Sequence, residues 1–150
     1  SRTEATLEHV QLAANLLTAA ENSGSAQSAI DYTIEYLNTR KQFGKLIGEY
    51  QAVKHPTVAA YVGYEKARSH LYSAAHSFGE QGNGEIATRM AAAQTERALA
   101  FASDRSIQFH GGFGFTYDCD AQLYRRRGIF NAALYGDESY QKKKLATLLL

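Results

Sequence analysis

The residues of this chain that could do chemistry gather first in one connector, residues 39–55, which reads TRKQFGKLIGEYQAVKH. Arg40, Phe43 and Gln51 lie close together there, between two segments with the pattern of helices. A plain turn needs only glycine and a few polar groups, whereas an arginine can bind a phosphate through two parallel hydrogen bonds. The connector therefore predicts a site for an anionic, flat ligand. For Arg40 the alternative is ordinary compensation of a helix dipole by a cation at the helix C-terminus.

A second candidate site is the segment QFHGGFGF, residues 108–115. Two adjacent glycines, Gly111 and Gly112, follow a helical run that contains Gln108. Glycines let a backbone approach a ligand closely and present N–H groups that suit phosphate or carbonyl oxygens. A glycine helix cap followed by a turn explains the same letters, so spacing alone leaves both readings open.

The other polar clusters have simpler interpretations than catalysis. No two histidines have the four-residue spacing of a helical metal site, so we expect no metal; they are His9, His55, His70, His76 and His110. Ser103, Asp104 and His110 are close in sequence, but adjacent residues of a helix do not face each other. The arginine run 125–127 is typical of a solvated face, with a CoA-type phosphate as the alternative partner.

The elements that must position these residues are helices. Apolar residues recur at helical spacing, alanine is abundant and there is one proline. The pattern predicts long helices over about residues 6–40, 51–78 and 85–110, a shorter helix over 121–135 and a last one beginning near 137. Long helices joined by short loops predict an all-α fold, an antiparallel up-down four-helix bundle with a short C-terminal helical extension.

Composition narrows the function further. The 150 residues suffice for one domain, and 45% of them are apolar. A net charge of +1 gives no reason to expect nucleic acid as a partner. No apolar run approaches the roughly 20 residues of a membrane span. A single cysteine, Cys119, rules out an internal disulfide framework and fits a reducing compartment, so we expect a cytoplasmic protein.

Two segments in this order resemble one family. YLNTRKQFGKLIGEYQAVKH and DRSIQFHGGFGFTYDCDAQLYRR are similar to the C-terminal helical domain of acyl-CoA dehydrogenases, which carries Arg-x-x-Phe-Gly…Gln after the first helix and Gln-x-x-Gly-Gly-x-Gly-(Tyr/Phe) after the third. The resemblance covers essentially the whole chain. It implies a four-helix bundle with FAD bound between subunits, and α,β-dehydrogenation of an acyl-CoA thioester.

The same resemblance assigns cofactor roles by position. Arg40 and Phe43 match family residues that touch the flavin cofactor, with the arginine on its pyrophosphate. Residues that approach the pyrophosphate and adenosine of the neighbouring subunit's FAD correspond to Gln108, Gly111 and Gly112. Gln51 matches a glutamine of the same FAD-facing region.

The catalytic base does not follow the family pattern. Most members place a glutamate in a Glu-Gly-Thr step, where this chain reads LYGDES, so Tyr135 precedes Gly136 and Asp137 takes the place of threonine. Other members carry the base on the first helix, at a position that corresponds to Ala14. Neither position holds a carboxylate, so the catalytic residue stays unknown.

Three explanations for the missing base remain open. A homologous partner subunit supplies it; or a shifted carboxylate, Asp137 or Glu138, replaces it; or the domain serves other flavin chemistry or assembly alone. Glu8 is the other nearby acidic residue, and a shift of one residue turns a helical side chain by about 100°.

The resemblance also implies partners: an acyl-CoA substrate, homologous subunits in a homo- or hetero-tetramer, and an electron-transfer partner. The N-terminal helical domain and the middle β-domain of the family are absent from these 150 residues, so we expect the isolated domain to be inactive. A non-catalytic helical assembly subunit of a heteromeric dehydrogenase is the alternative function.

Overall fold

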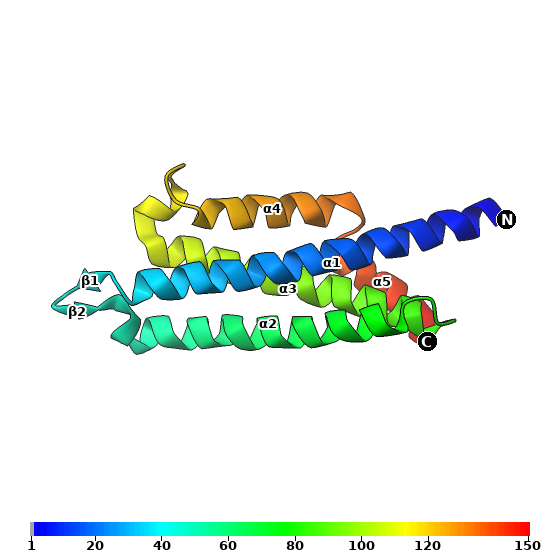
Figure 1. Ribbon diagram of the computed structural model, residues 1–150, viewed down its shortest axis with the longest axis horizontal. Coiled ribbons are helices and arrows are strands. Elements are labelled where there is room, and N and C mark those ends of the chain that lie inside the picture. The colour runs from blue at the N-terminus through cyan, green and yellow to red at the C-terminus, as the bar shows by residue number, and fades with distance from the viewer. Residues whose placement is uncertain (1) are drawn as a thin grey trace.

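The computed structural model describes residues 2–150, with side chains from residue 6 onward. The described chain is all-α apart from one small hairpin, which confirms the predicted fold class. Its helices are α1 (Arg2–Leu37), α2 (Gln51–Ser77), α3 (Asn83–His110), α4 (Ala121–Leu134) and α5 (Glu138–Leu149). The first four run antiparallel in an up-down order, and the short α5 packs across one end of the bundle, as Figure 1 shows.

The first helix is continuous through NSGS, residues 22–25. Asn22 and Ser23 are buried there, so these small polar residues form a packing surface and not a break. The helix ends at Leu37, three residues before the predicted boundary. Arg40 therefore follows the helix and does not belong to its last turn.

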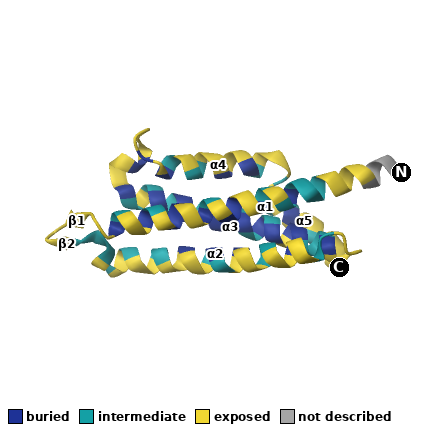
Figure 2. Cartoon of the chain, in the orientation of Figure 1, coloured by how far each residue is buried: buried dark blue, intermediate teal, exposed yellow. Residues whose placement is uncertain are grey.

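The third helix is the centre of the bundle and packs against all four other helices. Its buried positions are mostly alanine, serine and threonine, whereas the outer face of α2 is largely exposed (Figure 2). Buried hydroxyls donate to the carbonyl four residues earlier, as Thr88 does to Gly84 at 2.7 Å and Ser103 to Leu99 at 2.7 Å. Small side chains whose polar atoms are satisfied within their own helix let the neighbouring helices approach closely.

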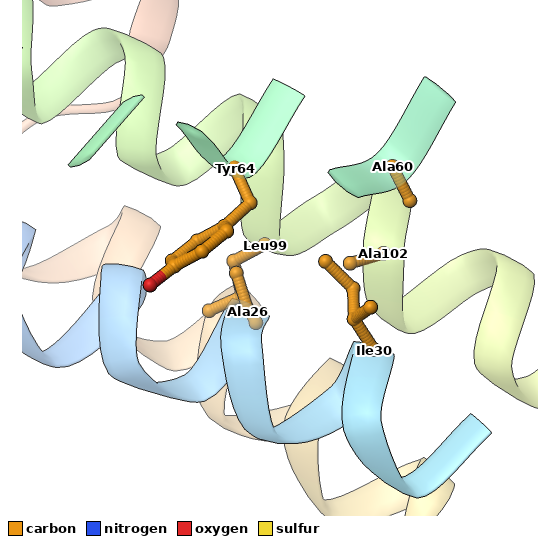
Figure 3. Packing of buried hydrophobic residues seen from close by; sticks show 6 residues of the cluster. All are labelled: Ala26, Ile30, Ala60, Tyr64, Leu99 and Ala102. Atoms are coloured by element: carbon orange, nitrogen blue, oxygen red, sulfur yellow. The ribbon is translucent and has the colours of Figure 1, made fainter. Parts of the chain in front are cut away.

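The larger hydrophobic cluster joins α1, α2 and α3 near their middles (Figure 3). Leu99 of α3 is fully buried between Ile30 of α1 and Tyr64 of α2. The Tyr64 hydroxyl donates a hydrogen bond of 2.9 Å to Oε1 of Gln27, so the ring can be buried without leaving its hydroxyl unpaired. This cluster fixes the three long helices relative to one another.

A two-stranded hairpin, which the sequence pattern did not predict, fills the connector between α1 and α2. Strands β1 (Lys41–Gln42) and β2 (Lys45–Leu46) pair antiparallel, and a 3₁₀ turn, η1 (Ile47–Glu49), leads into α2. At the same end of the bundle a second 3₁₀ turn, η2 (Gly111–Phe115), follows α3 (Figure 1). Both sequence motifs thus lie at one end of the molecule. Over residues 2–150 no helix has the length and apolar character that a membrane span needs.

Candidate functional site

An open cavity of about 510 Å³ lies between the hairpin connector and the end of α3. Its lining residues are Tyr36, Arg40, Gln42, Ile47, Phe109, His110, Gly111, Gly112 and Phe113. The structure therefore brings Arg40 and the glycine pair, which are about 70 residues apart in sequence, to the wall of one cavity. The lining combines a cation, backbone groups and aromatic rings.

Backbone hydrogen bonds hold Arg40 at the cavity. Its N–H donates to the carbonyl of Tyr36 at 2.9 Å, and its carbonyl accepts from the N–H of Ile47 at 2.9 Å. The side chain is exposed and has no ion pair with any residue from 6 to 150. A fixed backbone that carries an uncompensated guanidinium is suited to binding an anion.

The hairpin that follows Arg40 is held by Tyr50. The Tyr50 hydroxyl donates a hydrogen bond of 3.1 Å to the carbonyl of Gln42, and Nζ of Lys45 lies 4.2 Å from the centre of the Tyr50 ring. The two turn residues, Phe43 and Gly44, have positive φ angles of 53° and 84°. Such angles are easy for glycine but strained for phenylalanine, and the Phe43 side chain is 92% exposed. The fold thus presents an aromatic ring to its surroundings at some energetic cost.

The glycine pair begins where α3 ends. Gly111 has φ 62°, which is the left-handed region, and its N–H donates to the carbonyl of Gln108. No other atom lies within 4 Å of where a β-carbon would stand on Gly111 or Gly112. The backbone at this bend is therefore open to a ligand, as the predicted role requires.

His110 lines the cavity, although the sequence analysis found no metal-site spacing for it and assigned it no other role. It is 4% exposed, and its ring stacks between Tyr32 at 4.9 Å and Tyr36 at 4.1 Å between ring centres. Nδ1 lies 2.7 Å from the carbonyl of Ser106, and since a carbonyl can only accept, Nδ1 carries a hydrogen. The two tyrosines are spaced four apart on α1, and that spacing was the available signal.

The other predicted cofactor residues lie near this end but do not line the cavity. Phe43 projects from the hairpin turn, Gln51 is the exposed first residue of α2, and Gln108 is exposed in the last turn of α3. Their positions suit contact with a second chain more than contact with a ligand enclosed by this one. Their cofactor roles, like those of Arg40, Gly111 and Gly112, stay predictions.

Several polar residues that the sequence analysis considered as candidate sites have hydrogen-bond or ion-pair partners within the domain. Arg125 pairs with Asp104 at 2.8 Å, and Arg127 pairs with Glu21. Ser103 donates to its own helix, so it forms no triad with Asp104 and His110. Among the described residues no cluster of three or more His, Cys, Asp or Glu side chains could hold a metal ion.

The shifted carboxylates at the start of α5 also have structural roles. Oδ1 of Asp137 accepts a 2.8 Å hydrogen bond from the N–H of Tyr140 and caps the helix. Glu138 pairs with Lys142 at 2.5 Å. Glu8 is exposed on α1. If Asp137 acted as the catalytic base, its carboxylate could no longer cap α5.

The structure reveals one further carboxylate near this turn, Glu96 of α3. It borders a small cavity together with Asn15 of α1, Asn131 of α4, Tyr135 and Gly136. Burial raises the pKa of Glu96 to about 7, and the nearby negative charge of Asp137 contributes to the rise. Glu96 lies seven residues from Arg89 and from Ser103, which are both buried, but an arginine and a serine do not mark a buried helix face in a sequence, so no sequence signal singled out Glu96.

Comparison with known proteins identifies the family. The model of the acyl-CoA dehydrogenase C-terminal domain matches residues 12–150. Acyl-CoA dehydrogenase IpdE2 of Mycobacterium tuberculosis is 36% identical over 121 residues, which are 81% of this chain and 36% of that protein. The chain thus spans little more than a third of the length of this curated relative.

Solved structures agree with this match. A steroid ACAD, Tcur3481–Tcur3483, superposes with a TM-score of 0.85 at 27% identity, covering 90% of this chain and 37% of that one. The ChsE4–ChsE5 complex of Mycobacterium tuberculosis has a TM-score of 0.87 at 24% identity, covering 93% of this chain and 38% of its counterpart, and this likeness shows the fold alone. The chain therefore belongs to the acyl-CoA dehydrogenase family, as a C-terminal domain of that oxidoreductase family.

Proposed function

We propose that this domain contributes to α,β-dehydrogenation of an acyl-CoA thioester by binding part of an FAD cofactor. The FAD belongs to a neighbouring homologous subunit, and this domain binds its pyrophosphate and adenosine part. The observation that carries the proposal is the shared cavity of Arg40, Gly111 and Gly112. When bound, FAD supplies the acceptor for the hydride that leaves the β-carbon of the thioester. The residues of this chain bind and orient that acceptor.

The groups present fit a pyrophosphate. Arg40 offers an exposed guanidinium without an ion pair among the described residues, and the open bend at Gly111 and Gly112 offers backbone to a close ligand. The rings of Tyr36 and Phe113 border the same cavity and suit the flat parts of a nucleotide. The cavity is open and would accommodate part of such a ligand, which supports a cofactor shared between two chains.

A helical module that serves assembly alone gives no reason for this arrangement. Arg40 and the glycine pair would then need no common cavity, and the turn would need no phenylalanine at a positive φ. The two-part name of one structural neighbour at 27% identity, Tcur3481–Tcur3483, favours a non-identical partner. A partner that supplies the base would also account for the absence of a carboxylate at Ala14 and Tyr135. An electron-transfer partner and a cytoplasmic location remain part of the proposal.

The test is the flavin content of the purified assembly that contains this chain. Replacing Arg40→Ala removes a charge-assisted hydrogen-bond donor, for which a loss of about 1.5–3 kcal/mol is typical, so we expect FAD affinity to fall by roughly 10- to 100-fold. Helix content by circular dichroism should stay unchanged because the Arg40 side chain is exposed. Arg126→Ala is the matched control, since Arg126 is an exposed arginine whose side chain donates a hydrogen bond to Gln122 on its own helix. Equal flavin content in both variants would refute the cofactor role of Arg40.

A further inference from the structure

The cavity bordered by Glu96 lies away from the proposed flavin contact, toward the far end of α4. Its volume is about 10 Å³, which is close to the smallest space that admits one water molecule. Three helices border it through polar side chains: Asn15 from α1, Glu96 from α3 and Asn131 from α4. A water-sized space among polar groups differs from the empty, apolar cavities that packing defects leave.

Two atoms at this cavity lack partners. Nδ2 of Asn15 and Oδ1 of Asn131 are buried and have no hydrogen-bond partner among the described residues, and both side chains are 3% exposed. The other amide atoms of both side chains are already used: Oδ1 of Asn15 accepts from Gln141 at 3.4 Å, and Nδ2 of Asn131 donates to Asn22 at 2.8 Å. Rotating either amide alone would break an existing bond, and rotating Asn22 and Asn131 together would leave Nδ2 of Asn131 unpaired in place of its Oδ1, so each of the two asparagines keeps one unpaired amide atom.

One water molecule satisfies both atoms. Its oxygen accepts from Nδ2 of Asn15, and one of its hydrogens is donated to Oδ1 of Asn131. The water keeps one donor and one acceptor position, and the third polar group that borders the cavity is the carboxyl of Glu96. The water can donate to that group when it is ionised and accept from it when it is protonated.

We propose that this cavity is a binding site for one water molecule, which bridges Asn15 and Asn131, and that Glu96 at its border takes up and releases a proton beside the turn formed by Tyr135 and Gly136. The proton is exchanged with bulk solvent, to which the half-buried Glu96 is accessible, and only the O–H bond of the carboxyl is made or broken. The proposal does not depend on the flavin contact.

The surroundings of Glu96 favour its neutral form. The α1 and α4 side chains at the cavity, among them Asn15, Thr18 and Asn131, are uncharged. From the start of α5 the carboxylates of Asp137 and Glu138 raise the pKa of Glu96, while the N–H of Glu138 acts in the opposite direction. No lysine, arginine or histidine borders the cavity within the described chain.

The test of the proton site is a carbon-13 NMR titration of the 150-residue chain labelled at the glutamate carboxyl carbons. We expect one carboxyl to titrate with a midpoint of about 7, to disappear in Glu96→Gln and to persist in Glu80→Gln, which alters an exposed loop residue. If every glutamate titrated near the ordinary value of about 4.3, the proposal would be overturned.

A third variant separates the effect of the Asp137 charge on the pKa of Glu96 from the effect of burial. Asp137→Ser removes the neighbouring charge but keeps a hydroxyl that can cap α5, so the midpoint of Glu96 should move to lower pH. An unchanged midpoint would show that Asp137 does not act on the site and would contradict the geometry from which we argue.

The water itself is tested by nuclear Overhauser transfer from solvent to the Nδ2 hydrogens of Asn15. We expect a signal of the sign typical of a long-lived internal water in the wild-type chain, and its loss in Asn131→Leu, with Asn38→Leu, at an exposed position, as the control. If Asn131→Leu does not fold, the wild-type signal decides by itself. Absence of the signal in the wild-type chain would mean that the cavity is dry.

Discussion

At the scale of single residues, the chain satisfies most buried polar groups by short-range hydrogen bonds, but its fold shifts the pKa of a few titratable groups. Glu96 is the clearest case, since it is half-buried beside Asp137 without a cation at its cavity. Its pKa in the folded chain is raised to about 7 from 4.5. The folded state therefore keeps this proton over a pH range in which the unfolded chain has lost it.

This shift predicts a pH-dependent stability. The contribution of Glu96 is fully present below the unfolded value of 4.5 and is lost as pH rises through the folded value of about 7. Glu96→Gln removes that loss, so the variant should be more stable than the wild type by about 1 kcal/mol near pH 8, a figure reduced for solvent screening, and close to it near pH 4. Urea unfolding at both pH values measures this, with Glu80→Gln as control. A stability difference that is independent of pH would contradict the shift.

The side chain of Gln141 makes several buried hydrogen bonds that no sequence pattern indicated. It is completely buried, and its Nε2 lies within hydrogen-bond distance of Oδ1 of Asn15 and of the carbonyls of Tyr135 and Gly136. Its Oε1 accepts a 3.1 Å hydrogen bond from Arg89. One side chain thus ties α1, α3 and α5 to the turn before α5.

We expect Gln141→Met to cost about 2–3 kcal/mol of unfolding free energy. Methionine keeps the volume but leaves buried polar atoms of Arg89 and Asn15 unpaired, and each orphaned group costs about 1–3 kcal/mol. Gln81→Met, at an exposed loop position, should change stability by less than about 0.5 kcal/mol. Chemical denaturation of the two variants compares them directly, and equal stabilities would show that the Gln141 contacts contribute nothing net.

At the scale of elements, the hairpin between α1 and α2 holds Phe43 in a strained backbone conformation that exposes its ring. A two-residue turn with positive φ at both positions strongly prefers Asn-Gly, yet this chain has Phe43-Gly44. An observed strain of this kind motivates a functional hypothesis, and the exposed Phe43 ring matches the predicted flavin contact.

Phe43→Asn should therefore separate stability from binding. We expect the thermal midpoint of the chain to stay constant or rise, with a gain of up to about 1 kcal/mol from relieved strain, while FAD retention in the assembly falls several-fold. Differential scanning calorimetry and released-flavin absorbance measure the two effects. Val62→Asn, another exposed apolar residue but within α2, should lack the stability gain. Unchanged FAD retention would exclude Phe43 from the cofactor contact.

The helices could be predicted from the sequence because each is specified by its own local periodicity, and the predicted boundaries lie within four residues of the observed ones. The hairpin could not, because strands of two residues have no measurable alternation and phenylalanine is unusual in such a turn. Arg40 and Gly111 were marked by their local chemistry. Their common cavity depends on how α1 and α3 pack, as do the burial of His110 and the environment of Glu96, and no local pattern records such packing.

At the scale of the whole molecule, the bundle exposes apolar surface that its own helices do not cover. Leu7 and Leu17 follow the helical period of α1 but are 69% and 73% exposed, and Figure 1 shows the N-terminal part of α1 extending beyond its neighbours. A groove of about 950 Å³ between α2 and α3 is bordered by Val58, Val62 and Phe101. Exposed apolar surface on a folded domain is typical of interaction sites, and assembly with other subunits would cover it.

This surface makes assembly testable by one matched pair of substitutions. Val62→Glu places a carboxylate in the α2–α3 groove, where Val62 is 46% exposed, whereas Leu123→Glu places one on α4, where Leu123 is 51% exposed. Because desolvating a carboxylate at an interface costs several kcal/mol, which pairing with Lys66 of the same groove offsets only in part, we expect Val62→Glu to weaken subunit association at least about 10-fold and Leu123→Glu to leave it unchanged. Sedimentation equilibrium measures the association, and circular dichroism shows that the helices remain. If the two variants assembled equally well, the groove would not be the interface, and the subunit that shares the flavin would have to approach from the hairpin end of the bundle.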